Sequence, residues 1–274
     1  MNKIDFAIVI TAENCNPNGD PLNGNRPRQN FEGRGYMTDV CLKRKIRDRL
    51  QEMGESILIV ANDKAADGYR SIKERVHAVE TLKSEEKERD FDTYRKEACK
   101  IWIDVRTFGQ VFAYKGEDGS VSQPVRGPVS IRDAVSLEPI NIIDCCITKS
   151  TNLDAPKNQR TEKGSDTVGF KYFIDKGAYV AYGSVFPYLA EKTGFTEEDL
   201  EKLKQAMINL LENDASFRRP SGSMSSTLYW WKHSSAIGKN SALVHRSLNI
   251  RPTEEWPYFL CDPEEIQGVE LEIY

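Results

Sequence analysis

The sequence predicts an α+β fold, a mostly antiparallel sheet with helices on one face. Three observations support this class. Apolar, β-branched segments recur along the chain, two segments show helical spacing of apolar residues, and strands and helices do not alternate regularly as they do in parallel α/β folds. The 274 residues are 39% hydrophobic and 29% charged, ordinary values for a globular protein with one large core.

The N-terminal part is predicted to be a strand, a long loop and a helix. Residues 3–11 are apolar and β-branched, which favours a core strand. A loop rich in Asn, Gly and Pro follows over residues 12–36, and loops of this length are often functional. Thr38 is placed to cap a helix reaching about Met53, where Gly54 stops it. One face of this helix carries its apolar residues, Leu42, Ile46, Leu50 and Met53.

The middle of the chain mixes strands with a charged insertion. Residues 57–60 favour a short strand, and the charge-dense residues 67–100 favour helices in an insertion. Residues 102–113 suggest an extended segment or turn that carries Arg106. Residues 125–135 and 139–149 favour strands around a break at Gly127-Pro128.

The C-terminal part is predicted to complete the sheet. Residues 150–168 are polar and basic and suggest a flexible projection, and residues 169–186 are the best strand after the first. Thr196, with Asp199 three residues later, favours a capped helix over 197–212. A basic turn at 216–224 follows, and residues 269–274 are expected to close the sheet.

Charge is distributed unevenly although its sum is only −4. Residues 26–49 hold eight basic and three acidic residues, whereas residues 253–274 hold seven acidic residues and no basic one. Such asymmetry suits an anionic ligand at one end, or head-to-tail self-association. The cysteine spacing fits neither a zinc site nor a disulfide framework, and no segment is apolar and long enough for a signal or a membrane span. We therefore expect a cytoplasmic protein that does not bind a membrane.

The motifs of common enzyme sites are absent from the sequence. It has no phosphate-binding or dinucleotide-binding glycine motif, no H-E-x-x-H and no G-x-S-x-G. The three histidines, His77, His233 and His245, have no neighbouring metal-ligand partner in the sequence. Asp and Glu are plentiful, so catalytic carboxylates stay open, although no spacing pairs them. We assign no catalytic residue and expect no metal and no cofactor.

Three features instead indicate a polyanion ligand. Glycine, asparagine and arginine in the first loop can bring backbone and side-chain donors to phosphate oxygens. The following helix is basic, and residues 149–171 and 218–219 add further positive charge. Each feature alone also fits an ordinary solvated surface. Together they predict phosphate contacts from the following residues: Asn16, Asn18, Gly19, Arg26, Arg28, Arg34, Lys43, Arg44, Arg47, Arg106, Lys149, Lys157, Arg160, Lys163, Lys171, Arg218 and Arg219.

Several long motifs resemble a known family. ENCNPNGDPLNGNRPR and RGYMTDVCLKRKIRDRL, followed by DVRTFGQVF, GPVSIRDAVSLEPI and YVAYGSV, are similar to the type I-C CRISPR Cascade backbone subunit of the Cas7 family. The similarity spans essentially the whole chain. One departure is Ser130, where glutamine is commoner in the family.

The resemblance implies a single domain over 1–274, a modified RRM-like (ferredoxin-like) antiparallel sheet called the palm, with insertions. A helical finger is expected near 63–100 and a thumb near 148–169. It also implies a non-catalytic subunit that polymerises head-to-tail along CRISPR RNA and presents it to a target DNA strand for pairing. Further implied partners are the guide-processing and large Cascade subunits and a recruited helicase-nuclease.

Two other functions are left open by the residues. One is a metal-dependent ribonuclease of the type III backbone kind, for which Asp20 lies in the corresponding loop. The other is a structural filament protein that assembles without RNA.

Overall fold

The computed structural model describes residues 1–88, 90–116, 119–148 and 168–274. Its main feature is an eight-stranded sheet in which six strands follow the order β14-β11-β1-β10-β8-β4, and β7 and β9 also pair with β10. All pairings are antiparallel. The sheet strands are β1 (Ile4–Cys15), β4 (Arg34–Met37), β7 (Val129–Ile131), β8 (Ala134–Pro139), β9 (Ile142–Thr148), β10 (Val168–Val185), β11 (Met224–His233) and β14 (Val269–Ile273). The predicted large antiparallel sheet is confirmed.

The first strand shows why the sheet has two buried faces. Phe6, Ile8 and Ile10 belong to one apolar core, and the alternating Ala7 and Val9 belong to another. Side chains alternate between faces along a strand, so a continuous apolar run predicts cover on both sides.

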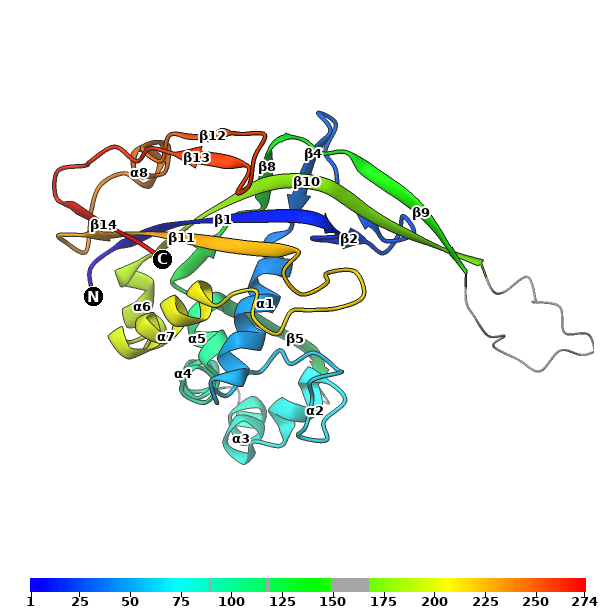
Figure 1. Cartoon of the computed structure of the whole chain (residues 1–274). Coiled ribbons are helices and arrows are strands. Elements are labelled where there is room, and N and C mark those ends of the chain that lie inside the picture. Colours follow the sequence, from blue (N-terminus) through cyan, green and yellow to red (C-terminus); the bar gives the residue numbers. More distant parts are fainter. Residues whose placement is uncertain (89, 117–118, 149–167) are drawn as a thin grey trace, which may run out of the picture.

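Helices cover one face of the sheet (Figure 1). They are α1 (Asp39–Glu52), α5 (Ile103–Phe108), α6 (Pro187–Thr193) and α7 (Glu197–Ile208). Thr38 caps α1 by accepting a hydrogen bond from the Cys41 backbone N–H, and Thr196 and Asp199 form the predicted capping box of α7. Leu42, Ile46 and Leu50 are fully buried as predicted, whereas Met53 is exposed at the end of α1.

A smaller layer covers the opposite face, which corrects the prediction of helices on one side only. It contains α8 (Ser241–Arg246) and the paired strands β12 (Ile250–Pro252) and β13 (Phe259–Cys261) (Figure 1). Val244, Leu248 and Phe259 from this layer pack with Tyr229 and Trp231 of β11 in the second core. The aromatic residues on this sheet face are therefore buried rather than open to a ligand.

The helices predicted over the charge-dense residues 67–100 are confirmed as α2 (Ile72–His77), α3 (Glu80–Glu88) and α4 (Phe91–Ile101). These helices pack around Val76, Leu82 and Tyr94 in a third apolar core, and they lie farthest from the sheet (Figure 1). Strands β5 (Gly109–Gly116) and β6 (Gly119–Arg126) form a separate hairpin. No helix among the described residues is long and apolar enough to cross a membrane.

Two local predictions are wrong. Residues 57–60 form no strand, because the backbone N–H groups of Leu58 and Ile59 donate to the Asp104 carboxylate (2.8 and 3.1 Å) instead of a neighbouring strand. The second concerns residues 102–113, predicted to be an extended segment or turn: residues 103–108 instead form helix α5, whereas residues 109–113 belong to strand β5. That helix ends at Gly109, whose φ of +80° and close approach to the Val125 carbonyl suit only glycine.

The first loop is more ordered than predicted. Strand β1 continues to Cys15, and the short strands β2 (Gly19–Asp20) and β3 (Arg26–Pro27) pair with each other before β4. Helix α7 ends four residues earlier than expected, at Ile208, and residues 209–213 form a turn.

Candidate nucleic-acid interface

A two-stranded arm leaves the sheet beside the first loop. Residues 174–185 of β10 pair with β1, whereas residues 168–173 pair with β9 alone, and Ile174 pairs with both strands. We call β9 and residues 168–174 the arm; it projects well beyond the body and leads to residues 149–167 (Figure 1). A hairpin of two strands is marginally stable by itself, so contacts at the base of the arm matter for its position.

Arg26 fastens the first loop to the arm. Its guanidinium contacts both carboxylate oxygens of Asp144 on β9 (3.0 and 2.9 Å) and stacks over the Tyr172 ring of β10 (4.5 Å to the centroid). The hydrogen bond to Asp144 raises the pKa of Arg26, and the side chain remains one-third exposed. Arg26 therefore holds the arm and still presents positive charge to solvent.

A polar cavity of about 420 Å³ opens next to Arg26. Its wall includes Arg28, Tyr36 and Asn141. The Nε atom of Arg28 is buried without a hydrogen-bond acceptor, and its nearest acidic contact is Asp20, 3.6 Å from Nη2. An unpaired buried donor is costly, so this cavity is chemically suited to an anionic or oxygen-rich ligand.

The turn between α7 and β11 meets the first loop. The Asn16 backbone N–H donates to the Arg218 carbonyl (2.8 Å). The Arg218 guanidinium donates to the Asn25 side-chain oxygen (2.8 and 2.9 Å) when the Asn25 amide is turned so that its oxygen faces the guanidinium. Next to Arg218, the exposed Phe217 ring lies under Lys171 of the arm, with Nζ 4.8 Å from its centroid. Segments distant in sequence thus meet at the base of the arm, where Tyr172 contacts Arg26 on one face of β10 and Lys171 contacts Phe217 on the other. We call the residues gathered there the arm-base surface: Arg26, Arg28, Tyr36, Lys171, Tyr172, Phe217 and Arg218.

Three predicted loop residues shape this surface from within. Asn16 is buried and donates to the Asn25 carbonyl (2.7 Å), and Asn18 accepts from the Thr38 backbone N–H (3.0 Å) at the start of α1. A side chain at Gly19 would collide with Asn25. These residues position the loop, although the Oδ1 atom of Asn16 is buried without a hydrogen-bond donor.

The basic residues of α1 already have partners inside the chain. Lys43 pairs with Asp39 (2.8 Å), and Arg44 pairs with Asp48 (3.3 Å) and also donates to the Ile59 carbonyl. Arg47 forms a buried ion pair with Asp104 (2.9 Å). Their contact with an external anion stays a prediction, and for Arg47 it would require breaking a buried pair.

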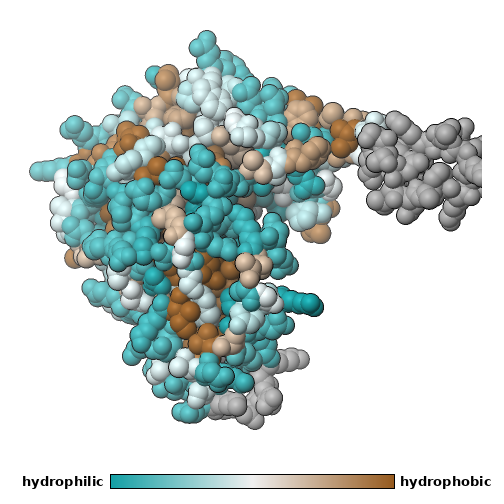
Figure 2. All heavy atoms as spheres, turned by 60° about the horizontal axis from the view of Figure 1, so that its bottom comes forward, coloured by the Kyte–Doolittle hydropathy of each residue, from teal (hydrophilic) through white to brown (hydrophobic). Residues whose placement is uncertain are grey.

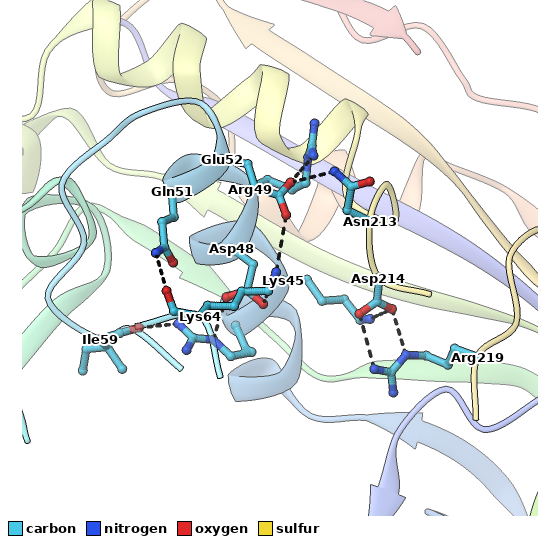
Figure 3. Close-up of polar contacts among 11 residues, drawn as sticks. Lys45, Asp48, Arg49, Gln51, Glu52, Ile59, Lys64, Asn213, Asp214 and Arg219 are labelled. Atoms are coloured by element: carbon cyan, nitrogen blue, oxygen red, sulfur yellow. Dashed lines mark hydrogen bonds and ion pairs between the residues drawn. The ribbon is translucent and has the colours of Figure 1, made fainter. Parts of the chain in front are cut away.

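Figure 3 shows how α1 is joined to the 213–219 turn. Asp214 accepts from Lys45 of α1 and from Arg219 (2.8 Å). The predicted site residue Arg219 is therefore neutralised locally. This ion pair holds the turn that carries Phe217 and Arg218 against the helix.

Two further predicted residues hold the fold. Arg106 contacts both carboxylate oxygens of Asp199 (3.0 and 2.7 Å) at the start of α7, away from the arm. Burial raises the pKa of Asp199, but hydrogen bonds from Arg106 and Thr196 outweigh it, so that this pKa lies below its ordinary value. Arg34 donates to the carbonyls of Ser136 and Leu137 (3.2 and 2.6 Å).

The remaining predicted residues, Lys149, Lys157, Arg160 and Lys163, lie outside the described residues, as does most of the predicted thumb. Asp20 accepts from the Leu22 backbone N–H (3.2 Å) and faces Arg28. Among the described residues, no three His, Cys, Asp or Glu side chains form a group that could hold a metal ion.

The prediction missed the aromatic members of the surface. Tyr36, Tyr172 and Phe217 stand in three separate segments, and only tertiary structure brings them together. Two sequence patterns could have indicated them: Phe217 directly precedes two arginines, and Lys171 directly precedes Tyr172.

Comparison with known proteins connects this chain to CRISPR systems. The profile of the family described as CRISPR-associated protein Cas7 matches residues 2–272. A CRISPR-associated protein Cas7 of Haloferax volcanii is 26% identical over 236 residues, which is 81% of this chain and 68% of that protein. A solved CRISPR RNA-guided surveillance complex, in a pre-nicking state, contains a chain with a TM-score of 0.51 at 16% identity, covering 84% of this chain and 76% of that one. This likeness shows a shared fold.

Proposed function

The chain belongs to the CRISPR-associated Cas7 family, and we propose that it is the repeating, non-catalytic CRISPR RNA-binding backbone subunit of a type I-C Cascade complex. The observation that carries the proposal is the arm-base surface. In it, separate segments bring cationic groups and exposed or half-buried rings together, the combination that single-stranded nucleic acid requires.

Phosphate contacts are the proposed mode of binding. Among the described residues, Lys171 and Arg218 have no carboxylate partner, and Arg28 keeps a long contact with Asp20 (3.6 Å) that leaves its Nε without an acceptor. These three cations can therefore neutralise phosphates. The aromatic sheet face cannot read bases, because the layer of α8, β12 and β13 covers it. Binding through phosphates does not depend on the RNA sequence. A subunit that must accept any guide needs this kind of binding.

The arm is the proposed element of head-to-tail assembly. Ile147, Val168 and Phe170 are exposed on it, and Figure 2 shows apolar side chains gathered there beside the grey segment. A second copy of the chain would cover them, in keeping with the thumb near 148–169. Helices α2 to α4 form the proposed finger of a modified RRM-like palm.

Other partners follow from the same proposal. The guide would pair with a target DNA strand, and the guide-processing and large subunits and a helicase-nuclease would join the complex in the cytoplasm. In this proposal the chain supplies the channel, and base pairing supplies the specificity.

Purification of the chain alone tests the proposal. Expressed in a bacterial host and purified at moderate salt, the protein should carry RNA in large oligomers that ribonuclease treatment dissolves. Large oligomers that persist without RNA would instead support a filament protein. A wild-type chain that binds no RNA at low salt, alone or with its operon partners, would contradict the proposal.

The absence of catalysis is tested separately. Bound RNA incubated with magnesium or manganese should stay intact in the wild type. Cutting at regular spacing that is lost in Asp20→Ala would establish the ribonuclease alternative.

A further inference from the structure

Phe217 is an exposed aromatic residue in an unusual setting. Its side chain is 67% exposed in the turn between α7 and β11, although that turn is anchored on both sides. Asp214 ties it to Lys45 of α1, and Arg218 ties it to the first loop. The ring is therefore presented to solvent by a fixed support rather than by a loose loop.

The groups around the ring are cationic. Lys171 Nζ lies 4.8 Å from the Phe217 centroid and 5.7 Å from that of Phe173, and among the described residues it has no carboxylate partner. Arg218 is the next residue, and its amide partner Asn25 carries no charge. An exposed cation–π contact is weak, so the Lys171 ammonium can turn readily to a phosphate.

We propose that Phe217 is a stacking platform for one unpaired base of single-stranded RNA, whose phosphate is held by Lys171. This inference rests on the proposed function and adds to it a contact with a base. Every base has a π face, so stacking on a ring tolerates any sequence. The site thus combines ring and charge without reading the guide.

A protein partner fits this place less well. A ring that anchors a protein interface is normally surrounded by apolar or mixed neighbours, whereas the described ionic neighbours of Phe217 are both cations. The apolar residues exposed on the arm, which we assign to assembly, are Ile147, Val168 and Phe170.

The test is the affinity of the full-length chain for a short oligoadenylate carrying one 2-aminopurine. Phe217→Ala should weaken binding about 5- to 150-fold, the range for loss of one base–aromatic stack. Phe217→Trp should keep the affinity, while Phe217→Leu should behave like Ala, because apolar bulk cannot replace a ring face. The slope of log K against log salt should stay unchanged in Phe217→Ala and flatten by about 0.7 in Lys171→Gln.

Phe31→Ala is the matched control, since Phe31 is likewise an exposed loop residue, and this variant should have no effect on affinity. Wild-type affinity in Phe217→Ala would overturn the inference and leave the proposed function standing. If Phe217→Ala instead weakened self-association of RNA-free protein at unchanged RNA affinity, the ring would contact a second copy, and the inference would fail. A wild-type chain that binds no oligonucleotide would refute the proposed function itself.

Discussion

Helix α1 and the arm-base surface are both rich in basic residues, but the structure uses them differently. On α1, Lys43, Arg44 and Arg47 each have a carboxylate partner within the chain. On the arm-base surface, Arg26 is closely paired with Asp144 and Arg28 keeps a longer contact with Asp20 (3.6 Å). Lys171 and Arg218 have no carboxylate partner among the described residues and contact a ring and an amide instead. The number of positive charges in a segment therefore does not locate an interface. The positive charges left without an internal counterion do.

The largest expected effect lies on the α1 side of this comparison. Asp104→Ala should lower the free energy of unfolding by about 3–5 kcal/mol, because it leaves Arg47 buried without its partner. It also removes the acceptor of two backbone N–H groups. Urea unfolding measures the loss. A change below about 1 kcal/mol would show that the pair is not needed and that Arg47 is available to a ligand.

The next effect concerns RNA. Replacing Arg28, Lys171 and Arg218 together by Gln should flatten the slope of log K against log salt by about 2, at about 0.7 for each single-strand phosphate contact. Filter binding of a short RNA across a salt series measures this slope.

The matched control removes the same charge from paired residues: Lys43→Gln, Arg44→Gln and Lys202→Gln, the last of which pairs with Glu55 and Glu198. Its slope should stay near that of the wild type. An equal loss in both triple variants would erase the distinction between the two regions.

Acid should lower the stability of the fold by breaking the ion pair between Arg106 and Asp199. The pKa of Asp199 is lowered in the folded protein from its ordinary value of 3.8, so its pairing with Arg106 stabilises the fold above that pH. The contribution is lost as the pH falls through the lowered pKa. Between pH 5 and pH 2.5, Asp199→Asn should therefore lose less stability than the wild type. Glu254→Gln, at an exposed pair with Lys176, is the control and should follow the wild type.

The smallest effect is expected at the surface of α1. Lys43→Ala should change the free energy of unfolding by less than about 1 kcal/mol, since the partly exposed pair with Asp39 gains little over hydration. Thermal unfolding is sufficient to measure it. A loss as large as that of Asp104→Ala would mean that exposed and buried pairs contribute alike, contrary to the comparison.

Local patterns in the sequence were sufficient for much of the fold. The apolar run in β1, the stripe of α1, and the Thr196–Asp199 capping box each depend on residues close together in the chain. Such patterns can be recognised without knowing which segments pack together, because buried residues repeat at a fixed spacing along a strand or helix. The family resemblance was likewise carried by contiguous motifs, and the family match over residues 2–272 confirms the Cas7 family.

Tertiary structure alone decided which charges face outward. The sequence predicted that Arg47 and Arg106 contact RNA. In the structure, Arg47 pairs with Asp104, 57 residues away, and Arg106 pairs with Asp199, 93 residues away. Residues 57–60 failed as a strand for the same reason, because the Asp104 carboxylate satisfies their backbone. The arm-base surface, in turn, exists only where the first loop, the arm and the 217–218 turn meet. Pairing of charges and rings depends on contact in space, and no spacing along the chain encodes it.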